Sequence, residues 1–117
     1  MNFLQALALR ARVYYWIATW NKKDLHYPPP VKDNPKFMTA WEAVKMIPDG
    51  ATIAISGMAG NQRCSLLLWG IRDMFRAEGS PKDLTVLCLG GQGGRGKVPG
   101  TIEELAIEGL NTRLITG

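Results

Sequence analysis

The chain has 117 residues, an apolar content of 46% and a formal net charge of +4 at pH 7. A chain of this length forms one domain at most, and such a domain buries roughly two thirds of the surface that its unfolded chain exposes. The charge is mild and no long run of like charge occurs, which argues against the basic stripe of a nucleic-acid-binding protein. No nucleic-acid partner is predicted.

Residues 1–20 are rich in apolar residues and helix formers, and they predict a helix with a narrow polar face of Gln5, Arg12 and Thr19. A transmembrane span is disfavoured, because an arginine at the centre of an inserted helix costs roughly 2.5–3.5 kcal/mol. A signal peptide is disfavoured because the charge lies inside the apolar stretch and no small-residue cleavage site follows.

The same helix carries an aromatic patch that needs a cover, made of Tyr14, Tyr15, Trp16 and Trp20. Packing against its own domain or subunit is the expected arrangement, a partner subunit is the first alternative, and a membrane surface is the least favoured. Residues 21–37 contain four prolines among charged residues and predict an extended connector. The domain proper is expected over residues 38–117, with residues 1–37 outside it.

The cysteines and the histidine give no sign of a reactive site. Cys64 and Cys88 have neither CxxC nor Cys/His ligand spacing, and they are expected to be reduced core thiols of a cytoplasmic protein. His26 has no partner at ligand spacing, so no metal site is predicted.

The domain reads as alternating helices and strands. The capping-box spacing from Thr39 to Glu42 predicts a helix over residues 40–47, and a second helix is expected over 65–78, with Gly79 ending it. Strands are expected over 51–55, 84–89 and 113–116, and a capping box at Thr101 predicts a further helix to about residue 107. This order predicts an α/β fold with an open, mainly parallel sheet and right-handed β-α-β crossovers.

Two glycine-rich loops then follow two neighbouring strands, over residues 56–61 and 90–100. Open α/β sheets bind ligands at the carboxyl ends of their strands, so both loops are expected to face one crevice. Glycine is also the default residue of tight turns, which is the structural alternative for each loop.

Residues 91–96 match the G-x-G-x-x-G pattern of dinucleotide sites. The pattern should open a helix directly, whereas residues 97–100 separate it from the cap at Thr101, and no acidic residue ends the next strand. A dinucleotide-binding module is therefore a minor alternative. A phosphate loop of the Walker type is excluded because no Gly-Lys-Ser/Thr follows.

Residues 38–117 resemble the beginning of a family I CoA-transferase, most like the single-chain acetate, propionate and short-chain acyl-CoA transferases. The matching stretches are residues 39–44, 47–52, 78–85, 91–96, 105–106 and 108–110. The resemblance implies an N-terminal portion of an enzyme that moves CoA between an acyl-CoA and a carboxylate through a glutamyl-CoA thioester. It also implies that a complementary half or subunit supplies the catalytic glutamate, so no catalytic residue is assigned here. Glu42, Glu103 and Glu104 are read as helix-start residues.

This segment is then expected to form the other wall of the site, with coenzyme A as a substrate and no further cofactor. The thioester and CoA contacts expected are Gly57, Met58, Ala59, Gly60, Asn61, Gly91, Gln92, Gly93 and Arg95. Arg63 and Lys97 are further candidates for the CoA phosphates, with plain solvation as the alternative for each basic side chain.

One departure from the family pattern concerns the first loop. The family's Asp-Gly, apolar run and Gly-Gly-Phe correspond to residues 49–50, 53–55 and 56–58, but its later Gly and Pro fall on Gln62 and Cys64. Loss of one oxyanion donor lowers the rate by about 10²–10³, so this change is consistent with a divergent substrate or with a catalytically inactive binding or structural subunit, which is the main alternative.

The chain also stops at its third strand, and natural proteins avoid such an unpaired edge. A fragment or a split subunit that associates into an oligomer is therefore expected.

Overall fold

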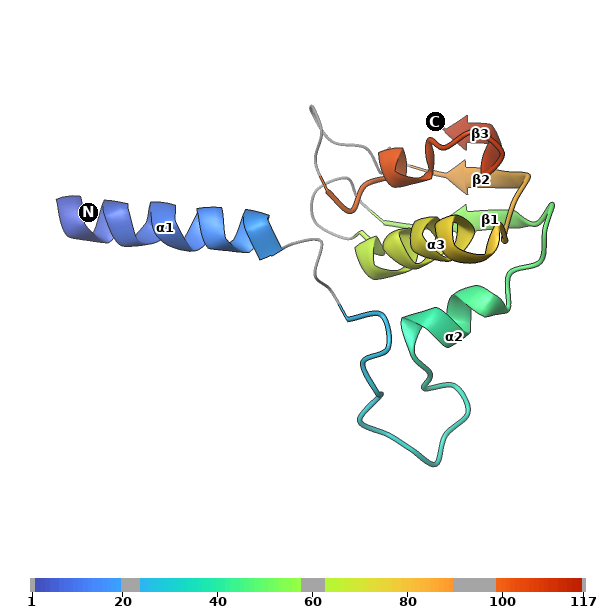
Figure 1. Cartoon of the computed structure of the whole chain (residues 1–117), viewed down its shortest axis with the longest axis horizontal. Coiled ribbons are helices and arrows are strands. Elements are labelled where there is room, and N and C mark those ends of the chain that lie inside the picture. The colour runs from blue at the N-terminus through green and yellow to red at the C-terminus, as the bar shows by residue number, and fades with distance from the viewer. Residues whose placement is uncertain (1, 20–23, 58–62, 90–98, 117) are drawn as a thin grey trace.

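The computed structural model describes residues 2–19, 24–57, 63–89 and 99–116. In chain order the elements are α1 (Phe3–Thr19), α2 (Ala40–Lys45), β1 (Thr52–Ile55), α3 (Ser65–Glu78), β2 (Leu84–Cys88), the 3₁₀ turn η2 (Ile102–Leu105) and β3 (Asn111–Thr116). Figure 1 shows the three strands side by side, with α3 running alongside them and α1 standing apart. The predicted α/β class is confirmed.

The sheet is parallel throughout and its strand order is β1-β2-β3. Ile53 pairs with Val86, which pairs with Leu114, so this row shares one face of the sheet. Between β2 and β3 the register shifts at Leu84/Thr85. The extra residue, Thr112, breaks the alternation of side chains, which explains why the sequence pattern predicts β3 only from residue 113.

The core lies between α3 and one face of the sheet. Every second residue of β2 is buried, and these meet the buried apolar face of α3; the fully buried members of the core include Leu68, Leu84, Val86, Leu105 and Leu110. Residues 65–78 have apolar side chains three and four apart, so one side of the helix is continuous and apolar. The predicted bounds of α3 are confirmed at both ends, and Gly79 ends it in the left-handed conformation at φ 72°.

Helix α2 begins as its sequence predicts. The Thr39 hydroxyl accepts a hydrogen bond from Glu42 N at 3.1 Å, and the Glu42 carboxylate accepts one from Thr39 N at 2.8 Å. The helix ends two residues before the predicted boundary. Gly70 of α3 lets α2 approach closely, because a Cβ there would lie 2.9 Å from Val44 Cγ2.

The connector is tied to the start of α2. Trp41 N donates to Leu25 O at 3.1 Å, and the rings of His26 and Trp41 lie 5.2 Å apart. His26 therefore packs against α2.

The turns that enter β1 and β2 are joined at the amino ends of the strands. Asp49 Oδ1 accepts hydrogen bonds from Ser80 Oγ at 2.7 Å and Lys82 N at 3.1 Å, and Gly50 N donates to Lys82 O at 2.8 Å. The hydrogen bond from Ser80 is the main reason that the pKa of Asp49 is lowered. Asp49 and Gly50, the Asp-Gly pair of the family pattern, thus stabilise the fold at the amino ends of β1 and β2.

The predicted helix after Thr101 is wrong in type and length. The structure has a short 3₁₀ turn, Ile102–Leu105, and the Thr101 side chain makes no cap. Its hydroxyl donates to the Glu103 carboxylate instead, which removes it from the capping box.

Helix α1 forms close to its predicted bounds, but the predicted packing against its own domain is wrong: none of its described residues is buried. The radius of gyration is 16.4 Å, against about 13–14 Å for a compact chain of this length. The projecting helix accounts for the difference (Figure 1). Within the described residues, no helix has both the length and the apolar character to cross a membrane.

Candidate functional site

The candidate site lies where the carboxyl ends of the parallel strands meet the start of α3. Strand β1 ends at Ile55 and is followed by Ser56 and Gly57, while Arg63 and Cys64 lead into α3. Gly57 has φ 143°, a conformation that side-chain-bearing residues rarely adopt. The chain can therefore leave the strand here along a path that only glycine takes easily.

Among the residues predicted to contact thioester or CoA, the structure describes Gly57 and Arg63. Met58, Ala59, Gly60, Asn61, Gly91, Gln92, Gly93 and Arg95 lie outside the described residues, as do Gln62 and Lys97. Their assignments stay predictions. Parallel pairing of β1 and β2 does bring the ends of these two strands together, because Ile55 pairs with Cys88.

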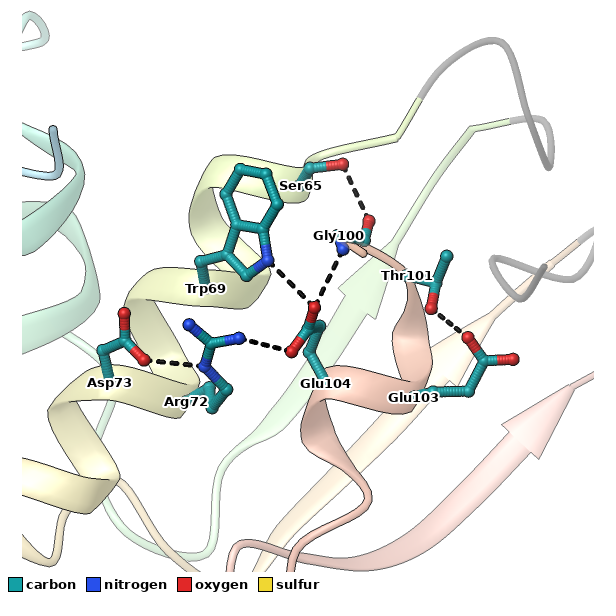
Figure 2. A network of polar contacts seen from close by, with 8 residues as sticks. All are labelled: Ser65, Trp69, Arg72, Asp73, Gly100, Thr101, Glu103 and Glu104. Atoms are coloured by element: carbon teal, nitrogen blue, oxygen red, sulfur yellow. Dashed lines mark hydrogen bonds and ion pairs between the residues drawn. The ribbon is translucent and has the colours of Figure 1, made fainter. Parts of the chain in front are cut away.

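A network of polar contacts joins the start of α3 to Gly100, at the end of the second glycine-rich segment, and to Glu104 (Figure 2). Ser65 Oγ donates to Gly100 O at 2.7 Å, and Gly100 N donates to Glu104 Oε1 at 2.9 Å. The same carboxylate oxygen accepts from Trp69 Nε1 at 3.0 Å, and Arg72 Nη1 reaches Oε2 at 2.5 Å. Residues 100–104 are thereby fixed to the first two turns of α3.

Glu104 is charged within this network. Its side chain is 16% exposed and that of Arg72 is 12% exposed, so water screens the pair weakly. Burial by itself raises the pKa of Glu104, but the hydrogen bonds from Gly100 N, Trp69 and Arg72 outweigh it and lower the pKa. A second carboxylate, Asp73, accepts from Arg72 Nε at 2.6 Å, and it is the main reason that the pKa of Arg72 is raised.

The network corrects the sequence reading of Glu104. It was expected as a helix-start residue, but it holds the segment after the second loop against α3, through partners 32 and 35 residues away in the chain as well as Gly100. No local pattern in the sequence could have indicated partners so distant.

Arg63 and Cys64 stand at the entrance to α3 with different surroundings. Arg63 Nη1 is buried and has no hydrogen-bond partner within the described part of the chain. A buried guanidinium nitrogen without a hydrogen-bond partner destabilises the folded protein, and an anionic group would accept its hydrogen bond. Burial raises the pKa of the half-buried Cys64 thiol, which weakens it as a nucleophile.

Two apolar grooves flank these residues. One, of about 360 Å³, runs between α2, β1 and α3 from Ser56 and Cys64 toward Ile47 and Ile71. The other, of about 500 Å³, lies between Trp16 of α1 and the start of α3, with Arg63 and Cys64 before the helix and Trp69 within it. No group of three or more His, Cys, Asp or Glu side chains able to hold a metal occurs in the described ranges.

Four of the described glutamates make contacts that serve the fold, and a fifth, Glu108, is exposed. Glu42 caps α2, Glu78 lies 3.9 Å from Lys45 Nζ, Glu103 contacts Thr101, and Glu104 belongs to the network above. Among the described residues, the next element after β2 is the 3₁₀ turn η2 and not an α-helix.

No family model matches the chain, and no curated protein sequence matches it significantly. Solved structures do match. The acyl-CoA transferase YdiF of Escherichia coli O157:H7, in its thioester complex with CoA, is similar to 68% of this chain with a TM-score of 0.62 and 31% sequence identity. The apoenzyme of the same transferase is similar to 77% of the chain, with a TM-score of 0.62 and 30% identity.

The chain spans 16% of the length of either of these structures. Fold and sequence similarity coincide over most of residues 1–117, and the expectation of a CoA-transferase-like α/β fold is confirmed. The chain is thus similar, in fold and in sequence, to a portion of an acyl-CoA transferase.

Proposed function

We propose that this chain is the N-terminal portion of a family I CoA-transferase and forms one wall of its acyl-CoA site. The observation that carries the proposal is the similarity to an acyl-CoA transferase at 31% identity over 68% of the chain. The parallel sheet supports it independently, because its glycine-rich segments follow the carboxyl ends of neighbouring strands, where open α/β folds bind ligands.

In the proposed reaction, CoA passes from an acyl-CoA to a short-chain carboxylate through a glutamyl-CoA thioester. A complementary half or subunit supplies the glutamate, in an oligomeric cytoplasmic enzyme. This chain contributes the loop after β1, where Gly57 starts an unusual backbone path, and the loop after β2, where Gln92 is the leading candidate for a thioester contact. Arg63, with its unsatisfied buried nitrogen, is the described candidate for an anionic group of CoA.

The test compares the chain alone with the chain mixed with, or fused to, the remainder of a CoA-transferase. Acyl-CoA is added, and any enzyme thioester is reduced with borohydride and located by mass spectrometry. We expect a modified glutamate only in the presence of the remainder and on the remainder. A modified glutamate on the chain alone would overturn the assignment of the catalytic residue.

A binding or structural subunit without catalysis is the second candidate. The specific observation in its favour is the presence of Gln62 and Cys64 where the family pattern has Gly and Pro, together with a Cys64 side chain that makes no helix cap. Equilibrium binding of CoA by the assembly, with no transfer of CoA to acetate or propionate, would select this candidate. Measurable turnover would eliminate it.

A further inference from the structure

The net charge of the chain is concentrated in the part that lies outside the α/β domain. Residues 1–37 hold six lysines and arginines against two acidic residues, and residues 38–117 hold eight of each. The whole formal charge of +4 therefore belongs to the N-terminal segment. Helix α1 contains Arg10 and Arg12 and no acidic residue.

The most exposed apolar side chains of the same helix gather on one side. Phe3, Tyr14, Leu4 and Tyr15 are 80%, 73%, 72% and 72% exposed. At 100° per residue these four positions fall within a stripe about 120° wide, which also includes Leu7. The less exposed apolar residues Leu9, Val13, Trp16 and Ile17, at 43–54%, lie outside this stripe, and Trp16 lines the groove beside α3. The stripe of Phe3, Leu4, Leu7, Tyr14 and Tyr15 thus turns away from the groove.

The arginines flank this stripe. Arg10 and Arg12 are two residues apart, so they project about 160° apart around the helix, one on each side of the stripe. Long basic side chains in this arrangement can lie along an apolar surface and keep their charge at its edge. Tyrosine combines an apolar ring with a polar tip, which suits the boundary between hydrocarbon and water.

We propose that α1 docks this protein onto an anionic lipid surface, lying in the plane of the interface with the stripe facing the acyl chains. Net positive charge beside an apolar stripe matches a negatively charged membrane surface, whereas pairing α1 with a second copy would bring arginines together. The sequence pattern of the helix alone makes a membrane surface the least favoured partner of α1, whereas the distribution of charge favours it.

The test uses the full 117-residue chain and two kinds of vesicle, one of phosphatidylcholine and one of equal parts phosphatidylcholine and phosphatidylglycerol. We expect co-sedimentation with the anionic vesicles that weakens as salt is added. The variant R10Q/R12Q should bind about 30-fold more weakly, since each basic residue at such a surface contributes about fivefold. The matched control R76Q/K82Q removes the same charge from exposed positions of the α/β domain and should bind like the wild type.

A second pair of variants tests the stripe. Leu4→Ser lies within it and should weaken binding at least tenfold, while Leu9→Ser, on the opposite side of α1, should leave binding nearly unchanged. Circular dichroism and sedimentation of each variant verify that it is folded. Equal binding of R10Q/R12Q and wild type, equal loss in both leucine variants, or self-association through α1 without vesicle binding would each overturn the proposal. None of these readouts depends on CoA transfer, so the proposed function stands or fails separately.

Discussion

At the scale of single residues, Gly100 meets two separate constraints. Its φ of 74° lies in the left-handed region, and a Cβ at this position would come within 2.6 Å of Ser65 Oγ and 3.0 Å of Trp69 Cζ2. Gly79 has a nearly identical φ of 72° with no atom within 4 Å of a Cβ. The two glycines therefore separate the effect of backbone conformation from that of close packing.

We expect Gly79→Ala to lower the free energy of unfolding by about 1 kcal/mol and Gly100→Ala by about 3 kcal/mol. The first change strains only the backbone, whereas the second also pushes Ser65 and Trp69 away from residue 100. Urea unfolding followed by circular dichroism measures both. Equal losses in the free energy of unfolding would show that the close approach of Gly100 to α3 does not contribute to the effect of Gly100→Ala.

Glu104 is the other residue on which the candidate site depends. Because its pKa is lowered in the folded protein, its contribution to stability is present above the pKa of the unfolded chain, near 4.5. This contribution is lost as the pH falls through the lower folded value. Wild-type stability should therefore decline in the acid range through this group.

We expect Glu104→Gln to cost about 2–3 kcal/mol at neutral pH, because Arg72 keeps its buried charge and loses the Glu104 carboxylate. The difference in the free energy of unfolding between wild type and this variant should shrink as the pH drops below about 4.5. The exposed Glu108→Gln is the matched control, with little change expected at either pH. A difference for Glu104→Gln that grew toward acid pH would contradict the assigned direction.

At the scale of elements, short α2 depends on its start. It has six residues, and both members of the capping box make their hydrogen bonds. Thr101 and Glu104 have the same spacing and form no box, because Glu104 turns to Trp69 and Arg72. Identical local patterns thus led to different structures, and the contacts of the carboxylate with α3 made the difference.

Thr39→Ala should therefore destabilise the protein by about 1 kcal/mol, and Thr39→Ser should restore most of that loss. For the second Thr-x-x-Glu sequence the comparison is Thr101→Ser, because serine keeps the hydroxyl that contacts Glu103. Thermal unfolding of the three variants provides the measurement. A loss of stability in Thr39→Ser as large as that in Thr39→Ala would argue against the capping role.

At the scale of the whole molecule, the sheet has apolar surface left uncovered. Strand β3 has Leu114 47% and Ile115 41% exposed, and these neighbours point to opposite faces. Parallel sheets are ordinarily covered on both faces. The proposed complementary part of the enzyme would supply that cover, and without it the edge is prone to association.

We expect the 117-residue chain to self-associate in solution and Ile115→Lys to shift it toward monomer, because a charge on the edge strand opposes pairing. Ala106→Lys adds the same charge at an exposed position outside the sheet and should leave association unchanged. Sedimentation velocity distinguishes these outcomes. A compact, stable wild-type monomer would show that β3 needs no partner.

The sequence by itself determined the elements whose signals are local and the class to which they belong. Residues 65–78 form the predicted helix with Gly79 ending it, and Thr39 caps α2 as expected, because these patterns depend on residues three and four apart. The alternation of strands and helices was sufficient to predict the parallel sheet. Only the tertiary structure decided the 3₁₀ turn after Thr101, the bulge at Thr112 and the role of Glu104. Each of these depends on groups brought together from about 30 residues apart, and no local pattern encodes such a meeting.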